Sequence, residues 1–344
     1  MTHSDNFHLK KLNNRLRAIL PQNQNVAVTI AGILDISKEG AYRRLRGTTS
    51  FTLDELMVLR KKIGLSIDEL LSGTENVSFS FKPLYNAPLE LDKYFEDVHV
   101  RFKKIGDIQH SMTYNVCEDL PFFRQFGYTA LASFKLFYWK HSILLEPEYT
   151  MLKFNTEAIP PDTLALAQTM HTLYCDIPST EVWTELTLKN TLRQIEYFQD
   201  CGFFETEESL RLVYMDLIQL LDDLMSDARQ ASKKNEATAG QVDFHLYICE
   251  LSLNNNSVYL ETHEPKFLAT GFNGFNSLQT MNTRLLNEYK QWLSAMLSKL
   301  TKISGQAERT RREFYRASMA LITQSAKGRL AEPLQTNANQ NMSS

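Results

Sequence analysis

The residue types best suited to chemistry in this sequence lie in one stretch, Ile30–Gly47, which reads IAGILDISKEGAYRRLRG. Within it, Ala41 and Leu45 are one helical turn apart and form an apolar seam. The charged side chains that fall outside this seam are Lys38, Glu39, Arg43, Arg44 and Arg46. Ammonium and guanidinium groups exposed on such a helix can reach the phosphates and base edges of a DNA duplex. The stretch therefore predicts binding to nucleic acid.

A cationic helix of this kind needs a partner helix that holds it at a fixed angle, and the residues before it supply one. The apolar face of this first helix is formed by Val26, Ile30, Ala31, Ile33 and Leu34. Ala31 is small enough for a second helix to approach closely. Asp35 occupies the turn, Ile36 is an apolar plug, and Ser37 can cap the second helix, which runs to about Gly47. This order is typical of a helix-turn-helix.

Three further helices are predicted around this pair. Apolar residues at helical spacing mark a helix over Leu9–Leu20, which Pro21 ends. Thr52 and Glu55 have the spacing of a capping box and open a helix over Leu53–Ile63, closed by Gly64. A second capping box, Ser66 with Glu69, opens a short fifth helix. The first 72 residues therefore predict a compact five-helix bundle.

Residues 8–72 resemble the Cro and phage-repressor type of helix-turn-helix family, also called XRE-type. The matching positions are the Ile30–Ala31 pair, the turn over 34–37, Arg43, and the Arg46–Gly47 exit, followed by the capped helices. The chain departs from the family pattern with Asp35 at the usual turn glycine, with Gly40 inside the second helix, and with Arg44 at a position that is often aliphatic. The resemblance implies a DNA-binding domain that acts as a homodimer in transcription control.

The resemblance, together with the positions on the helix, assigns the candidate contacts. Lys38, Glu39 and Arg43 are expected to contact base edges. The candidates for base or backbone contact are Asn25, Thr29, Ser37, Tyr42, Arg44 and Arg46. The alternative interpretation is a plain helical bundle whose arginines only keep it in solution. The basic run over residues 60–62 is interpreted as the last turn of a helix, where cations are favoured by the macrodipole, rather than as a second DNA contact.

Charge is distributed unevenly along the chain. The whole sequence of 344 residues has a net charge of −3, with 43% apolar and 22% charged residues, which is ordinary globular composition for two or three domains. Residues 1–72 contain 11 basic and 7 acidic residues, so they carry +4 and the remainder carries −7. We therefore expect only the N-terminal domain to meet a polyanion.

The rest of the chain is predicted to be mainly helical. A linker over residues 73–88 leads to a larger helical domain over 89–329, and a disordered tail covers 330–344. Within the large domain, the alternating segments Val242–Leu253 and Ser257–Thr262 flank an asparagine-rich turn and predict a small antiparallel β-hairpin. The predicted fold class is therefore mainly α, a five-helix head followed by a helical domain with a small antiparallel sheet.

Other chemistry finds little support. The sequence contains no phosphate-binding glycine loop, no nucleophile elbow and no paired histidines at metal-ligand spacing, so we expect neither catalysis nor a cofactor or metal. The glycines around Phe272 predict a turn rather than a ligand loop. The four cysteines are widely spaced, no signal peptide is evident and no stretch is long enough to span a membrane. A cytoplasmic protein without membrane contact is predicted.

Three interpretations of the large domain stay open. It can be a dimerisation scaffold that brings two heads to a DNA site, a sensor for a small molecule or peptide, or a protein-interaction module whose head binds DNA non-specifically or has lost that function. We expect the first, with effector sensing as an additional role, in a sequence-specific transcriptional regulator.

Overall fold

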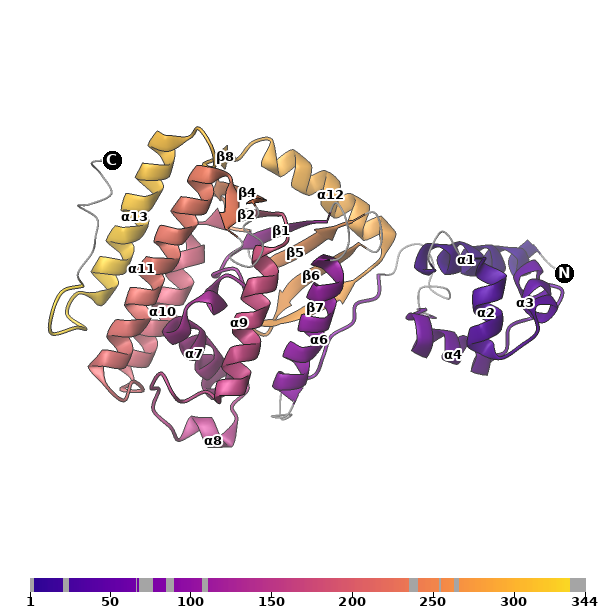
Figure 1. Cartoon of the computed structure of the whole chain (residues 1–344), viewed down its shortest axis with the longest axis horizontal. Helices are drawn as coiled ribbons and strands as arrows, with labels where there is room; N and C mark the ends of the chain where they lie inside the picture. Colours follow the sequence, from indigo (N-terminus) through magenta and orange to yellow (C-terminus); the bar gives the residue numbers. More distant parts are fainter. Residues whose placement is uncertain are drawn as a thin grey trace. The chain divides into compact units, whose positions relative to one another are not determined.

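The computed structural model describes residues 3–20, 25–65, 67, 77–84, 90–106, 111–234, 241–253, 255–262 and 266–334. The chain divides into two compact units (Figure 1). The first, which we call the head, comprises Met1–Phe79 with Thr280–Leu285. The second, the body, comprises Ser80–Gln279 and Leu286–Ser344.

The described part of the head is helical. Its helices are α1 (His3–Ile19), α2 (Val26–Leu34), α3 (Lys38–Arg46) and α4 (Leu53–Ile63). A single apolar core joins them, with Leu16, Ile30, Ala41 and Leu59 completely buried. The capping box of Thr52 and Glu55 is present at the start of α4. The predicted fifth helix, apart from Ile67, and half of the predicted linker lie outside the described residues.

The body combines helices with one mixed sheet. Its helices are α6 (Glu90–Gly106), α7 (Thr129–Tyr138), α8 (Pro147–Thr150), α9 (Pro161–Cys175), α10 (Leu186–Asp200), α11 (Glu207–Gln230), α12 (Thr283–Leu297) and α13 (Glu308–Ala326), with a 3₁₀ turn η1 (Gln125–Gly127) and a π-helical turn η2 (Trp139–Ile143). The strands are β1 (Met112–Cys117), β2 (Ser179–Thr184), β3 (Ser232–Lys234), β4 (Gln241–Cys249), β5 (Ser257–Glu261), β6 (Phe267–Phe272), β7 (Asn276–Thr280) and β8 (Thr301–Lys302). The mainly helical fold class is confirmed.

The sheet corrects the predicted hairpin. The strand order is β3-β4-β2-β1-β5-β6-β7, with β8 on β4. Strands β1, β2 and β4 are parallel, whereas β5 pairs antiparallel with β1 and β6. The predicted segments therefore do form strands, β4 and β5, but β2 and β1 lie between them. Every residue of β2 is buried, so its sequence lacks the alternation that marks a half-exposed strand.

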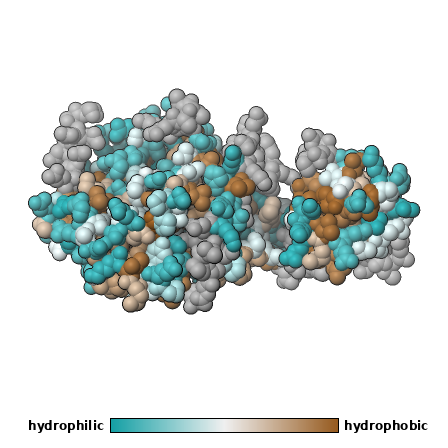
Figure 2. Space-filling model, turned by 60° about the horizontal axis from the view of Figure 1, so that its bottom comes forward, coloured by the Kyte–Doolittle hydropathy of each residue, from teal (hydrophilic) through white to brown (hydrophobic). Residues whose placement is uncertain are grey.

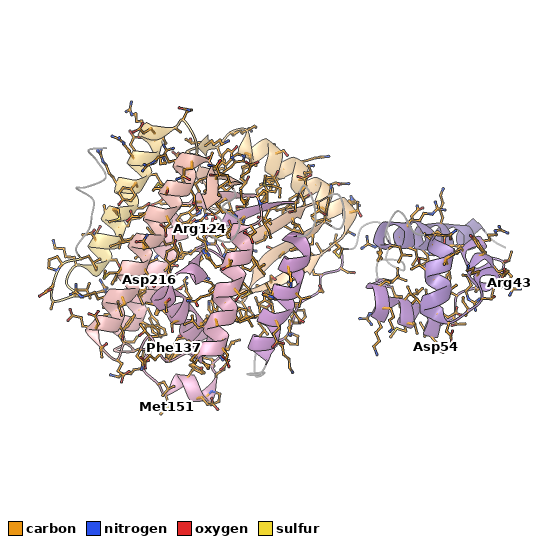
Figure 3. All side chains as sticks on the ribbon, viewed as in Figure 1. Arg43, Asp54, Arg124, Phe137, Met151 and Asp216 are labelled. Carbon is orange, nitrogen blue, oxygen red and sulfur yellow. The ribbon has the colours of Figure 1, made fainter. Side chains whose placement is uncertain are left out.

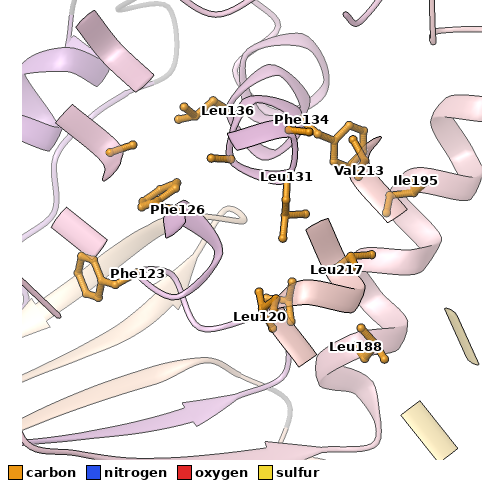
Figure 4. Close-up of a cluster of buried hydrophobic side chains, with 14 of the residues drawn as sticks. Leu120, Phe123, Phe126, Leu131, Phe134, Leu136, Leu188, Ile195, Val213 and Leu217 are labelled. Atoms are coloured by element: carbon orange, nitrogen blue, oxygen red, sulfur yellow. The ribbon is translucent and has the colours of Figure 1, made fainter. Parts of the chain in front are cut away.

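Alternate residues of the sheet face different helices. On β5, Leu260 belongs to the main core, while Tyr259 meets Tyr289 of α12 and Glu261 pairs with Lys290. The main core lies on the other side, where α10 and α11 contact β2 and β4 and α11 packs against α7. Figure 4 shows part of this core, with Phe134 of α7 beside Val213 of α11. All residues of α7 from Ala130 to Phe137 are buried, so this helix lies within the main core.

Candidate nucleic-acid interface

The turn between α2 and α3 is fixed by hydrogen bonds at each of its residues. Asp35 has φ of 53°, a left-handed conformation that Asp tolerates, and its N–H donates to the Ala31 carbonyl. The N–H of Ile36 donates to the same carbonyl at 3.1 Å. The Ser37 hydroxyl oxygen then accepts from the Gly40 N–H at 3.0 Å and caps α3. The predicted turn and cap are confirmed, and they set the direction of α3.

One side of α3 is open to solvent. Its exposed residues are Lys38, Glu39, Tyr42, Arg43 and Arg46. Their spacing places them in one row along the helix, while Ala41 is completely buried and Leu45 packs on the core of the head. Arg43 and its side chain can be followed in Figure 3. Three cations and one carboxylate occupy this row, so its net charge suits a phosphate-rich partner.

The start of α2 is tied to the exposed row. The Asn25 side chain caps α2 by accepting from the Ala27 N–H, and its amide donates to the Tyr42 hydroxyl at 2.9 Å. The Arg46 guanidinium lies over the Tyr42 ring, 5.8 Å from its centroid. Thr29, half-buried, donates its hydroxyl hydrogen to the Asn25 carbonyl at 3.3 Å. The N-terminus of α2 and the outer row of α3 therefore form one continuous surface.

Arg44 corrects an expectation from the sequence. It was expected to face outward, but its guanidinium binds the Glu55 carboxylate at the start of α4 through two hydrogen bonds of 2.9 and 2.6 Å. Both side chains are only 16% exposed. The ion pair raises the pKa of Arg44 and lowers that of Glu55. Arg44 therefore does not belong to the exposed row of α3.

The loop after α3 adds candidates that sequence reasoning missed. Thr48 and Thr49 are exposed, and their N–H groups donate to the Arg43 carbonyl at 3.0 and 3.3 Å. These hydroxyl-bearing residues follow the C-terminus of the cationic helix, and side chains of this type commonly bind backbone phosphates. The signal in the sequence was the polar run TTS directly after Gly47. The basic residues over 60–62 lie in the last turn of α4, as expected.

The body contains charged groups of a different kind, since they are buried and paired. Arg124 donates to Glu181 at 2.9 Å and to Asp227 at 3.0 Å, and Glu181 also accepts from Tyr174 and Trp183. Burial lowers the pKa of Lys233, which is completely enclosed, to about 7. Within the described ranges, no group of three or more His, Cys, Asp or Glu side chains could hold a metal ion.

The turn geometry and the exposed cationic row define a helix-turn-helix head. Comparison with family models agrees: residues 4–90 match the BetR domain, a family of helix-turn-helix-like DNA-binding domains. This match indicates a DNA-binding regulatory role, while the finer resemblance to Cro and phage repressors stays a prediction. Searches of curated proteins and of solved structures give no match. None of the helices that the structure describes is both long and apolar enough to cross a membrane.

Proposed function

We propose that this chain is a sequence-specific transcriptional regulator that binds operator DNA as a homodimer in the cytoplasm and has no catalytic activity of its own. The observation that carries the proposal is the exposed row on α3, held by a hydrogen-bonded turn in a region that matches a DNA-binding domain family. Cations that were buried in the head could not reach DNA. Lys38, Arg43 and Arg46 are exposed, so their charges are open to a partner.

Each part of the surface has a proposed role. Lys38, Glu39 and Arg43, in the row that would enter the major groove, contact base edges. Arg46 and Tyr42 contact the backbone or a base near the exit of the helix. Asn25, Thr29 and the positive end of the α2 dipole receive a phosphate, as helix N-termini do. The Ser37 hydroxyl already caps α3, so its contribution to DNA is through its place in the turn.

Self-association is proposed because one such head covers only a few base pairs. Two heads about 34 Å apart are needed to read two half-sites on one side of the duplex. Apolar side chains exposed on α4 support self-association: Leu53, Met57 and Val58 are 70%, 46% and 38% exposed. Figure 2 shows that apolar residues also gather on one face of the head. The body would supply the rest of the dimer contact and the sensing of an effector.

Selection from a pool of random duplexes by the purified full chain tests the proposal. We expect enrichment of a motif with two related half-sites, bound at least about 10³-fold more tightly than a scrambled duplex at physiological salt. Affinity should fall steeply as salt rises, because bound phosphates release counterions. A pool that stays random after repeated rounds would refute sequence-specific binding.

The alternative function is a protein-interaction or small-ligand sensor module with a non-specific or vestigial head. It predicts equal affinity for selected and scrambled duplexes, or no binding even at low salt. A native mass measurement then distinguishes the roles of the body, because a strict monomer at micromolar concentration contradicts the dimer. A thermal-shift screen with metabolites and peptides tests for a sensed ligand directly.

A further inference from the structure

We propose that Glu55 is a positioning residue for the recognition helix α3 and acts through Arg44 without touching DNA. This inference rests on the proposed function of the head. The inference concerns the Arg44–Glu55 ion pair. The helix-turn-helix pattern does not require this pair, because an apolar residue at position 44 could pack on the core instead. The pair joins the last turn of α3 to the first turn of α4 across a chain separation of eleven residues.

The contact restrains Arg44 at three points. Its Nε and Nη2 atoms donate to the two oxygens of Glu55 at 2.9 and 2.6 Å, which is the planar two-bond geometry that makes Arg–carboxylate pairs strong. Its Nη1 atom donates to the Gly40 carbonyl at 3.2 Å, one turn back along α3. The guanidinium is therefore fixed both to α4 and to its own helix.

Gly40 lies directly beside the Arg44 guanidinium and the Ser37 cap. A Cβ atom at position 40 would lie 3.2 Å from the Ser37 hydroxyl and 3.6 Å from Arg44 Nη1. Glycine costs an interior helix position about 1 kcal/mol relative to alanine. Only the contact with the Ser37 hydroxyl is tight, so the cap of α3 favours glycine here, while the Arg44 guanidinium lies beside it at ordinary contact distance.

Glu55 is held as firmly as Arg44. Its Oε2 atom also accepts from the Thr52 N–H at 3.0 Å, and its own N–H donates to the Thr52 hydroxyl at 3.2 Å, which completes the capping box of α4. A carboxylate fixed by its own helix start is a rigid anchor for a side chain of the next helix. The pair therefore sets the rotation of α3, and with it the direction of Arg43 and Arg46.

Electrostatics gives the opposite prediction if the pair merely masks a DNA-binding arginine. Loss of the Glu55 charge would then free Arg44 for a phosphate and strengthen binding to every duplex. Under the positioning role, the same change weakens binding to the selected duplex alone. The sign of the effect separates the two explanations.

The test compares full-length wild type with Glu55→Gln, Arg44→Met and the double variant. Gln is itself a capping-box residue, so Glu55→Gln keeps the start of α4. Asp54→Asn is the matched control, because it removes an exposed carboxylate from the same helical turn. Anisotropy is measured with the selected duplex and a scrambled duplex, and amide exchange in α3 is followed without DNA.

We expect each single variant to lose about five- to tenfold in affinity for the selected duplex, with the double variant no weaker, since the two residues act as one unit. Affinity for the scrambled duplex, the salt slope and Asp54→Asn binding should stay near wild type, while exchange in α3 accelerates in Glu55→Gln. Tighter binding by Glu55→Gln, or a salt slope lowered by about one in Arg44→Met, would overturn the proposal. Unchanged amide exchange in α3 of Glu55→Gln would also overturn the proposal, and this measurement does not depend on DNA. Absence of sequence preference in the wild type would instead refute the proposed function.

Discussion

At the scale of single residues, the two exposed arginines of α3 differ in position, and we expect them to make different contacts with DNA. Arg43 lies in the middle of the row, with its carbonyl bound by the N–H groups of the following loop and its side chain exposed. Arg46 lies at the exit of the helix, where its guanidinium stacks over the Tyr42 ring. A central arginine suits base edges, whereas one at the exit suits the backbone.

Arg43→Ala should therefore relax sequence preference. We expect a loss of about 1–3 kcal/mol on the selected duplex and little change on a scrambled one, because a two-bond contact to a base is specific. Fluorescence anisotropy with duplexes substituted at each position identifies the base that Arg43 contacts in the wild type. Wild-type affinity for the selected duplex in this variant would contradict the assignment of α3 as the recognition helix.

Arg46→Ala is expected to behave differently. Loss of a phosphate contact weakens binding to all duplexes alike and lowers the slope of log affinity against log salt by about one. Titrations of the selected and scrambled duplexes at several salt concentrations measure this slope. A selective loss on the selected duplex would instead place Arg46 on a base edge.

At the scale of elements, α1 packs closely against the C-terminus of α3 in the head. Gly47 ends α3 with φ of 80°, and a Cβ atom there would lie 2.5 Å from a methyl group of Leu9 on α1. The Asn13 side-chain amide donates to the Leu45 carbonyl at 2.7 Å in the same region. The left-handed backbone favours glycine at position 47, and a side chain there would also have to displace the end of the Leu9 side chain.

Gly47→Ala should consequently cost more than an ordinary glycine substitution at a helix end. Gly64 is the matched control, because it has φ of 68° but nothing within 4 Å of its Cβ position. We expect Gly64→Ala to lose about 1 kcal/mol of unfolding free energy from the left-handed backbone alone, and Gly47→Ala to lose about 2–4 kcal/mol in total. Urea unfolding followed by a probe in the head measures both. Equal losses would show that Leu9 moves aside freely.

Local signals explain how much of these elements could be predicted. The turn at Asp35, the Ser37 cap and the capping box of Thr52 depend on residues within one helical turn, and all are present. The inward direction of Arg44 depends on Glu55 in another helix, and the separation of β4 from β5 depends on strands more than sixty residues away. Such non-local contacts leave no periodic pattern in the sequence.

At the scale of the whole molecule, buried polar pairs connect the helices of the body to its sheet. Lys135, at the centre of α7 and with no exposed surface, donates to both oxygens of Asp119, which follows β1, at 3.0 Å. Burial raises the pKa of Asp119, but Lys135 and the Thr191 hydroxyl outweigh it and the pKa is lowered. Removing one partner leaves the other charge buried and unpaired.

Asp119→Asn is therefore expected to destabilise the body by about 3–5 kcal/mol, far more than a surface substitution. Asp162→Asn on the exposed start of α9 is a suitable control, because it removes the same charge from solvent-exposed surface. Urea unfolding of both variants measures the difference. A loss below about 1 kcal/mol in Asp119→Asn would mean that Lys135 gives up its charge or finds other acceptors.

His171 makes the stability of the body depend on pH. Its Nδ1 atom lies 3.0 Å from the Phe123 carbonyl, and the ring fills the space where a Cβ atom on Gly127 would stand, at 2.6 Å. Burial disfavours the charged imidazolium and lowers the pKa from 6.5 to about 4. The unfolded chain therefore binds a proton below pH 6.5 that the folded chain does not take up until about pH 4, so stability falls as the pH is lowered through this window.

The loss attributable to His171 should reach about 2 kcal/mol at pH 5 relative to neutral pH. His171→Asn keeps a donor for the Phe123 carbonyl but has no titrating group, so the difference in unfolding free energy between wild type and this variant isolates the histidine. We expect that difference to shift in favour of the variant as the pH falls from 7.5 to 5, measured by urea unfolding at each pH. A difference that does not change with pH would show that the imidazole is protonated equally in both states, which requires water or a carboxylate to reach it inside the fold.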